Sequence, residues 1–205
     1  MMVGQNTALL VVDIINDFNF EGGSKLLSRA LLMVPRLASL KSRAKHAGIP
    51  VIYANDPFGH TDYQKLLNYC LEAETSGRSI VKQIAPKKDD CLILKPKHSA
   101  LFQTDLETIL HSQNVNTVIL TGIAGDICVL FTANDAHMRD FNVIVASDCI
   151  ISENPEQNRQ AIKLMQRALK AKVVSSDELE FGDTSHPFED VIPWSIARNV
   201  FGSPW

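Results

Sequence analysis

The residue in this sequence best suited to covalent chemistry is Cys128, the last residue of the segment 121–128, Thr-Gly-Ile-Ala-Gly-Asp-Ile-Cys. An apolar run at 117–120 precedes it, so a buried strand is predicted to pass through a small-residue turn into a helix. The first N–H groups of a helix lack intrahelical partners and lie at its positive end. They favour a thiolate, which is the nucleophilic form, and could bind the oxyanion of an attacked carbonyl. The segment indicates covalent catalysis, with an inert core cysteine as the alternative.

Two further reactive side chains follow predicted strands. Asp13 comes after the apolar run 8–12, and Lys95 comes after the run 91–94. Ligands of such sheets bind beyond the carboxyl ends of the strands, so these groups are expected to meet the thiol at one edge. A carboxylate, an ammonium group and a thiol supply the base, cation and nucleophile of acyl transfer. Taken singly, Asp13 could instead cap a helix and Lys95 could be a solvated lysine.

Other polar residues follow the second and fifth predicted strands. Asn55 and Asp56 come after the strand at 51–54, and Ser147-Asp148 closes the strand at 142–146. The Ser-Asp pair is expected to tie down the edge of the crevice through bonds from side chains to the backbone.

The elements that must position these residues alternate between strands and helices. Strands are predicted at 8–12, 51–54, 91–94, 118–120, 142–146 and 173–174, and helices at about 25–47, 62–74, 104–112, 127–139 and 156–171. Pro35 is expected to interrupt the first helix, and Gly48 to cap its end. The alternation predicts an α/β fold, a doubly wound and mostly parallel six-stranded sheet with helices on both faces. A chain of 205 residues fits one such domain, 1–205.

Composition excludes several classes of protein. The net charge of −3 gives no electrostatic reason to expect nucleic acid or an anionic membrane as a partner. No apolar run approaches the roughly 18 residues of a membrane span, and residues 1–6 lack the pattern of a signal peptide, so a cytoplasmic location is expected. The segment 13–18 lacks the glycines of a dinucleotide-binding turn, and no cofactor is predicted. The cysteines, without a C-x-x-C pair, are read as reduced thiols: Cys70, Cys91, Cys128 and Cys149.

The last segment, 177–205, differs from the rest in being rich in aromatic residues. It contains Phe181, Phe188, Trp194, Phe201 and Trp205 among three prolines. So many aromatic side chains are unusual on a fully solvated segment. We expect an arm that packs either on its own domain or on a neighbouring subunit.

Three segments together carry a family resemblance. They are 9–18 (Leu-Leu-Val-Val-Asp-Ile-Ile-Asn-Asp-Phe), 94–101 (Leu-Lys-Pro-Lys-His-Ser-Ala-Leu) and 120–128. They resemble the isochorismatase-like cysteine hydrolases, the superfamily that includes nicotinamidases and N-carbamoylsarcosine amidohydrolase. The resemblance covers about 7–176, with Leu101 as a departure from the usual Phe. It implies a homodimer or higher homo-oligomer acting on a small molecule.

The resemblance implies a catalytic triad of Asp13, Lys95 and Cys128. From the residues alone, either Lys95 or Lys97 could be the lysine that faces the thiol. The family's lysine precedes the proline, which selects Lys95. Asp13 would take the thiol proton and return a proton to the leaving amine, while Lys95 would orient the carboxylate and favour the thiolate.

The resemblance also implies an oxyanion hole in the turn before the nucleophile. The backbone N–H groups of Ala124 and Cys128 would bind the oxyanion. In this family the peptide bond aligned with Ile123–Ala124 is commonly cis.

The expected substrate is a small amide or ureide. Nicotinamidases of this superfamily bind a metal through Asp-x-His, but here Phe58 stands where that histidine belongs, so no metal is predicted, with His60 as the alternative ligand. True isochorismatases do not need the cysteine, so the retained thiol favours an amide over a vinyl ether. A vinyl-ether hydrolase and a catalytically silent scaffold stay as alternatives. Candidate substrate-binding residues are Phe18, Asn55, Asp56, Phe58, His98 and Phe131.

Overall fold

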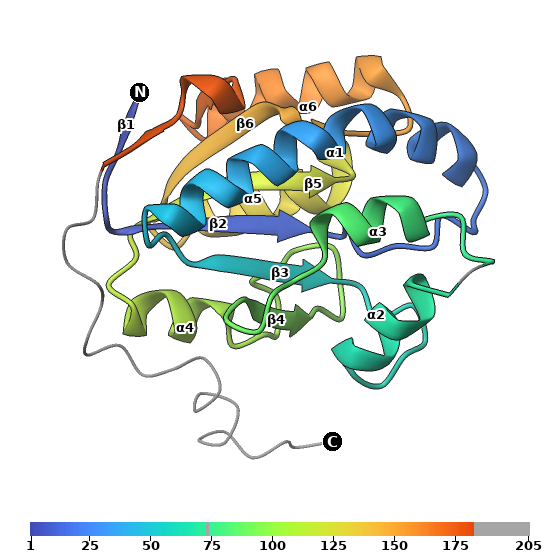
Figure 1. Ribbon diagram of the computed structural model, residues 1–205. Coiled ribbons are helices and arrows are strands. Elements are labelled where there is room, and N and C mark those ends of the chain that lie inside the picture. Colours follow the sequence, from blue (N-terminus) through green and yellow to red (C-terminus); the bar gives the residue numbers. More distant parts are fainter. Residues whose placement is uncertain (73, 183–205) are drawn as a thin grey trace.

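Six parallel strands form the central sheet of the structure, a computed structural model that describes residues 1–72 and 74–182 (Figure 1). The strands are β2 (Thr7–Val12), β3 (Val51–Asn55), β4 (Cys91–Leu94), β5 (Thr117–Ile123), β6 (Asn142–Ile151) and β7 (Lys172–Val174). Their order across the sheet is β4-β3-β2-β5-β6-β7, and every neighbouring pair is parallel. The predicted α/β fold class with a six-stranded doubly wound sheet is confirmed.

Helices cover both faces of this sheet. One face carries α1 (Gly23–His46), α2 (Tyr63–Cys70) and α3 (Arg78–Ile84), and the other carries α4 (Leu106–Ser112), α5 (Leu130–His137) and α6 (Pro155–Ala168). Alternate residues of β2 show why: Leu9 and Val11 pack in the first layer, Leu10 and Val12 in the second. All four are buried because a central parallel strand is covered on both sides.

Two features of the first face differ from the sequence prediction. Pro35 does not interrupt α1, which runs unbroken from Gly23 to His46 with the proline on its exposed side. The helix α3 has no counterpart among the predicted elements. Gly77, the N-cap residue before the helix, offers no side-chain cap, and the helix is only seven residues long, so the usual start signals are missing.

The strand β6 is longer than the sequence indicates, and this corrects the placement of Ser147 and Asp148. The strand continues through both residues to Ile151, and the two residues lie where its register with β5 is irregular, between Val145 and Ile150. Ser147 Oγ donates to Val174 O at 3.1 Å, and Asp148 accepts from the Ser176 N–H at 2.7 Å. The expected tie to the backbone exists, but along the strand rather than at its end.

The chain ends of the described region lie together. The strands β1 (Met2–Val3) and β8 (Glu180–Phe181) pair in parallel, beside the 3₁₀ turn 176–178. Arg43 on α1 donates to the carbonyls of Leu179 and Ser176 at 2.7 and 2.6 Å. The predicted arm beyond Gly182 lies outside the described residues. In the part of the chain that the structure describes, no helix is long and apolar enough to cross a membrane.

The strand order reverses between β2 and β5, and this position defines the crevice where ligands bind in such sheets. Val12, the last residue of β2, pairs with Gly122 of β5. Gly122 has φ +113°, and a β-carbon there would lie 2.0 Å from Val12 O. Only glycine therefore lets the two strand ends approach this closely, which places Asp13 beside the turn that leads to Cys128.

Candidate active site

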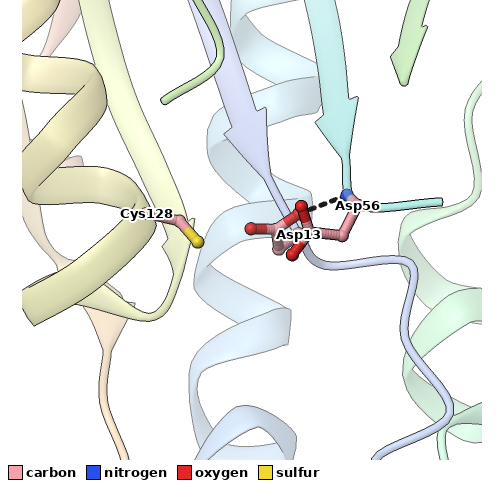
Figure 2. A group of neighbouring side chains, drawn as sticks. All are labelled: Asp13, Asp56 and Cys128. Atoms are coloured by element: carbon pink, nitrogen blue, oxygen red, sulfur yellow. Dashed lines mark hydrogen bonds between the residues drawn. The ribbon is translucent and has the colours of Figure 1, made fainter. Parts of the chain in front are cut away.

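The side chains of Asp13, Lys95 and Cys128 meet at the carboxyl ends of β2, β4 and β5. All three are buried, with exposed fractions of 4%, 0% and 7%. The Lys95 Nζ lies 2.9 Å from Asp13 Oδ2 and 3.6 Å from Cys128 Sγ. Figure 2 shows the Cys128 sulfur and the Asp13 carboxylate facing each other from separate elements. Lys97, the other lysine of the segment, is exposed. The structure thus brings the predicted carboxylate, ammonium group and thiol together.

A second carboxylate, Asp56, completes the cluster. Its backbone N–H donates to Asp13 Oδ1 at 2.7 Å, the bond drawn in Figure 2. Its own Oδ1 accepts from Lys95 Nζ at 2.7 Å, and the same ammonium donates to Lys97 O at 3.1 Å. Asp56 was predicted as a substrate-binding candidate, but its carboxylate is engaged by Lys95. One buried lysine is therefore shared between two carboxylates and the thiol.

The second oxygen of Asp13 is well placed for proton transfer. Oδ2 is buried and is paired electrostatically with Lys95, yet among the described residues no donor hydrogen-bonds to it with good geometry. Oδ1 is held by the Asp56 N–H, which fixes the plane of the carboxylate. A carboxylate oxygen with free lone pairs beside a thiol has the geometry of a general base.

The charges of the cluster shift its pKa values. Burial raises the pKa of Asp13 to about 6, with Lys95 opposing the shift and Asp56 adding to it. Burial and the negative charge of Asp13 raise the pKa of the Cys128 thiol, and Lys95 offsets only part of this. Burial alone would lower the pKa of Lys95, but Asp13 and the other acidic partners raise it above its usual value.

These shifts correct the expectation that the helix start holds Cys128 as a thiolate. Burial beside Asp13 favours the neutral thiol, while above about pH 6 Asp13 is the ionised member of the pair. A neutral thiol becomes a nucleophile only when it loses its proton, and the carboxylate beside it that could take this proton is Asp13.

The turn that carries the nucleophile has an unusual hydrogen-bond pattern. The Ile123–Ala124 peptide bond is cis, at the position that the resemblance implies. Residues Gly125–Val129 then form a π-type turn in which Ala124 O accepts from Ile127 N–H at 3.2 Å and Val129 N–H at 3.1 Å. Ala124 O therefore accepts from the residues directly before and after Cys128, and not from the Cys128 N–H itself. This π-type register fits an N–H reserved for a ligand, as π-turns at functional sites often do.

Two of the substrate-binding candidates form a wall beside the thiol. His98 Nδ1 lies 4.0 Å from Cys128 Sγ, and the His98 ring stacks on Phe131 with a centroid distance of 5.6 Å and an interplanar angle of 29°. Phe131 is 50% exposed. Phe58 is also exposed, on the loop after β3, with φ +46°. Exposed rings of this kind are available for contact with a flat or apolar ligand.

Phe18 and Asn55 belong instead to the framework of the site. Phe18 is buried in the hydrophobic core under α1. Asn55 is completely buried, donates to Ile15 O at 2.9 Å and accepts from the Tyr63 hydroxyl at 2.9 Å. Asn55 ties the end of β3 to the segment after β2, and Phe18 is a core residue. The sequence pattern places Tyr63 on a helix but gives no sign of this bond.

The donor set does not fit a metal ion. One ligand atom each of Asp13, Asp56 and Cys128 lies within 4.8 Å of the others, but the Lys95 ammonium contacts all three groups. A second cation there would meet the charge of the lysine at close range. The ring of His60, the alternative ligand, packs at a tilt against the Tyr69 ring, with a centroid distance of 5.0 Å and an interplanar angle of 39°. The absence of a metal stays a prediction.

Known proteins resemble this chain over most of its length. The model of the isochorismatase domain matches residues 7–178. The uncharacterised isochorismatase family protein YaaI of Bacillus subtilis (strain 168) is 40% identical over 174 residues, 84% of this chain and 95% of YaaI. The N-carbamoylsarcosine amidase of Arthrobacter sp is 23% identical, covering 95% of this chain and 78% of that protein.

A solved structure extends this likeness to the fold. The crystal structure of N-carbamoylsarcosine amidase from Thermoplasma acidophilum matches with a TM-score of 0.65 and 27% identity, over 85% of this chain and 98% of that one. The domain match covers most of the chain, and YaaI is similar over nearly its whole length. The chain therefore belongs to the isochorismatase family of hydrolases.

Proposed function

We propose that this protein hydrolyses the C–N bond of a small amide or ureide through a thioester on Cys128. The observation that carries the proposal is the close packing of a buried thiol, a buried carboxylate and a buried ammonium group. The Lys95 Nζ lies 3.6 Å from Cys128 Sγ and 2.9 Å from Asp13 Oδ2. The amidase names of two relatives support the amide class.

In the acylation step, Asp13 acts first as a base and then as an acid. Its free oxygen takes the thiol proton as the Cys128 sulfur forms a bond to the carbonyl carbon. The backbone N–H groups of Ala124 and Cys128 bind the oxyanion. When the intermediate collapses, Asp13 gives its proton to the nitrogen, the C–N bond breaks, and ammonia or an amine leaves.

In the deacylation step, water attacks the thioester carbonyl. Asp13, ionised again, takes a proton from this water, the C–S bond breaks, and the proton passes to the sulfur, which regenerates the free thiol. Lys95 stays protonated throughout because its pKa is raised by its acidic partners. Its charge stabilises the ionised Asp13 between the two steps.

Cleavage of a vinyl ether, the alternative reaction, would leave the thiol without a role. Cys128 is buried against a base and a cation, and burial of a polar, reactive group beside two charges is difficult to explain by packing alone. The amide reaction uses all three groups.

The test combines a substrate screen with detection of the acyl-enzyme. Ammonia release from a panel of small amides and ureides would be measured, and the activated ester p-nitrophenyl acetate would serve as a general acylating probe. We expect an acyl adduct on the Cys128 peptide by mass spectrometry, and Cys128→Ala to lower turnover by at least about a thousandfold. Cys70→Ala, at a buried cysteine in the core, is the matched control. Turnover that survives Cys128→Ala would refute the proposal.

A further inference from the structure

The π-type turn that carries Cys128 is held from outside by a chain of hydrogen bonds. The Asp126 N–H, in the first half of the turn, donates to Ser152 Oγ at 3.1 Å. The Ser152 hydroxyl donates in turn to Asn158 Oδ1 at 3.0 Å, and Asn158 Nδ2 donates to Ile150 O at 3.2 Å. Ser152 and Asn158 each accept one hydrogen bond and donate another, so the chain of bonds is complete from the turn to the backbone of β6.

This chain is built into the fold by three elements. Ser152 is buried and directly follows β6, whose last residues Ile150 and Ile151 pair with the end of β5. Asn158 lies on the first turns of α6, whose start is fixed by Asn154, which caps the Glu156 N–H at 2.8 Å. The extension of β6 beyond Ser147-Asp148 is what brings a serine next to the nucleophile turn.

A glycine allows the contact. A β-carbon at Gly125 would lie 2.0 Å from Asn158 Oδ1 and 2.5 Å from Ile150 Cγ2. Since Gly125 does not have a positive φ, its requirement comes from this close approach and not from backbone conformation. The turn and α6 are therefore packed directly against each other at the position that precedes Asp126.

We propose that Ser152 and Asn158 are positioning residues that aim the N–H groups of the nucleophile turn at the substrate carbonyl. The inference rests on the proposed function, because it assigns the two residues to the oxyanion hole of that reaction. They do not touch the reacting atoms. They act through Asp126, whose N–H they fix, and so set the direction of the N–H groups of Ala124 and Cys128 on either side.

The experiment compares two reactions of the same thiol. Acylation by p-nitrophenyl acetate passes through an oxyanion, whereas alkylation by iodoacetamide displaces iodide at a CH₂ group and forms none. Loss of one oxyanion donor costs about 10²–10³-fold in catalysis, and a misdirected donor costs less. We therefore expect Ser152→Ala to slow acylation by about 10- to 100-fold. Its alkylation rate should stay within about twofold of the wild type, because displacement of iodide needs no oxyanion donor.

A matched control and a second variant complete the design. Ser147→Ala removes the same kind of hydroxyl five residues earlier, within β6, where Ser147 Oγ donates to Val174 O, and should change neither rate. Asn158→Ala leaves the Asp126–Ser152 bond but removes its support, and should slow acylation by about 3- to 10-fold. Asn158 is a half-buried helix residue, so Asn158→Ala still tests the proposal if Ser152→Ala does not fold. Thermal unfolding would show whether each variant folds.

The outcomes separate the two proposals. If Ser152→Ala and Asn158→Ala acylate as fast as the wild type, or lose acylation and alkylation in parallel, the positioning role is overturned while the thioester chemistry stands. If the wild type is not acylated at Cys128 at all, the proposed function itself has failed. A selective loss of acylation in both variants, absent in Ser147→Ala, supports the inference.

Discussion

Asp56→Asn tests how the two carboxylates share one lysine. The substitution keeps the size of the side chain and the backbone N–H that donates to Asp13, but removes one negative charge. Burial is the main cause of the raised pKa of Asp13, and the charge of Asp56 adds to it. Without that charge, Lys95 acts on Asp13 unopposed, and the pKa of Asp13 should fall.

The size of the shift follows from the separation of the charges. A carboxylate oxygen of Asp56 lies within 4.8 Å of one of Asp13. At that distance two unit charges repel by about 0.9 kcal/mol in water and by about 3.5 kcal/mol at an effective dielectric constant of 20. One pKa unit corresponds to about 1.4 kcal/mol, so the limits are roughly 0.6 and 2.5 units. Because the Asp56 side chain is 35% exposed, solvent screening favours the lower part of this range, about one unit.

The assay is the pH dependence of acylation by p-nitrophenyl acetate. Asp13 must be ionised to take the thiol proton, so the rate falls as the pH drops through its pKa, which lies at about 6 in the wild type. For Asp56→Asn we expect this acidic limb near pH 5, lower by about one unit. Asp62→Asn is the control, since this half-exposed aspartate accepts a capping hydrogen bond from the Lys65 N–H of α2 at 2.9 Å, and asparagine caps equally well.

Two results would refute the reasoning. An acidic limb that does not move would mean that the group titrating there is not coupled to Asp56. A limb that moves to higher pH would mean that Asp56 chiefly holds Lys95 in place, so that its loss takes the cation away from Asp13. The wild-type limb itself must lie well above the ordinary aspartate pKa for either comparison to be meaningful.

Two further predictions concern stability and the substrate wall. Asp90, whose side chain is completely buried, pairs with Lys41 at 2.8 Å and with Lys45, so Asp90→Ala leaves two partly buried ammonium groups without a shared partner. Urea unfolding should show that the free energy of unfolding falls by about 3–5 kcal/mol, and a fall of less than about 1 kcal/mol would contradict this role. His98→Phe keeps a ring stacked on Phe131 and should leave kcat/KM within about threefold of the wild type, whereas His98→Ala should lower kcat/KM by about tenfold for a substrate with a planar acyl group. Equal losses in both variants would instead show that the imidazole nitrogens take part in the reaction.

The strand ends were predictable because apolar runs stop at polar residues, and this is why Asp13, Lys95 and Cys128 could be placed at one edge. The same rule failed in β6, where Ser147 and Asp148 interrupt the apolar pattern without ending the strand. Their polar groups bond to Val174 and Ser176, more than twenty residues further along the chain. A local pattern cannot contain partners at that distance.

The site beyond the triad shows the same limit. Asp56 was identified as a polar residue after β3, but its contact with Lys95 joins the ends of two strands and depends on side-chain packing. Ser152 and Asn158 carry no motif at all, and each resembles an ordinary surface or capping residue in sequence. The raised pKa of the thiol could not be foreseen either, because burial depends on the completed fold.

The central pairing of β2 with β5 sets the order in which the protein can become active during synthesis. Thr7 pairs with Thr117, so β2 leaves the ribosome more than a hundred residues before its partner. In the meantime β2 can pair with β3, and β3 with β4, which already brings Asp13 and Lys95 together, but the other edge of β2 stays open and apolar. Cys128 arrives with the strand that closes this edge. A nascent chain therefore lacks the complete cluster of Asp13, Lys95 and Cys128 until β5 covers the open edge of β2, and the proposed activity can appear only after that closure.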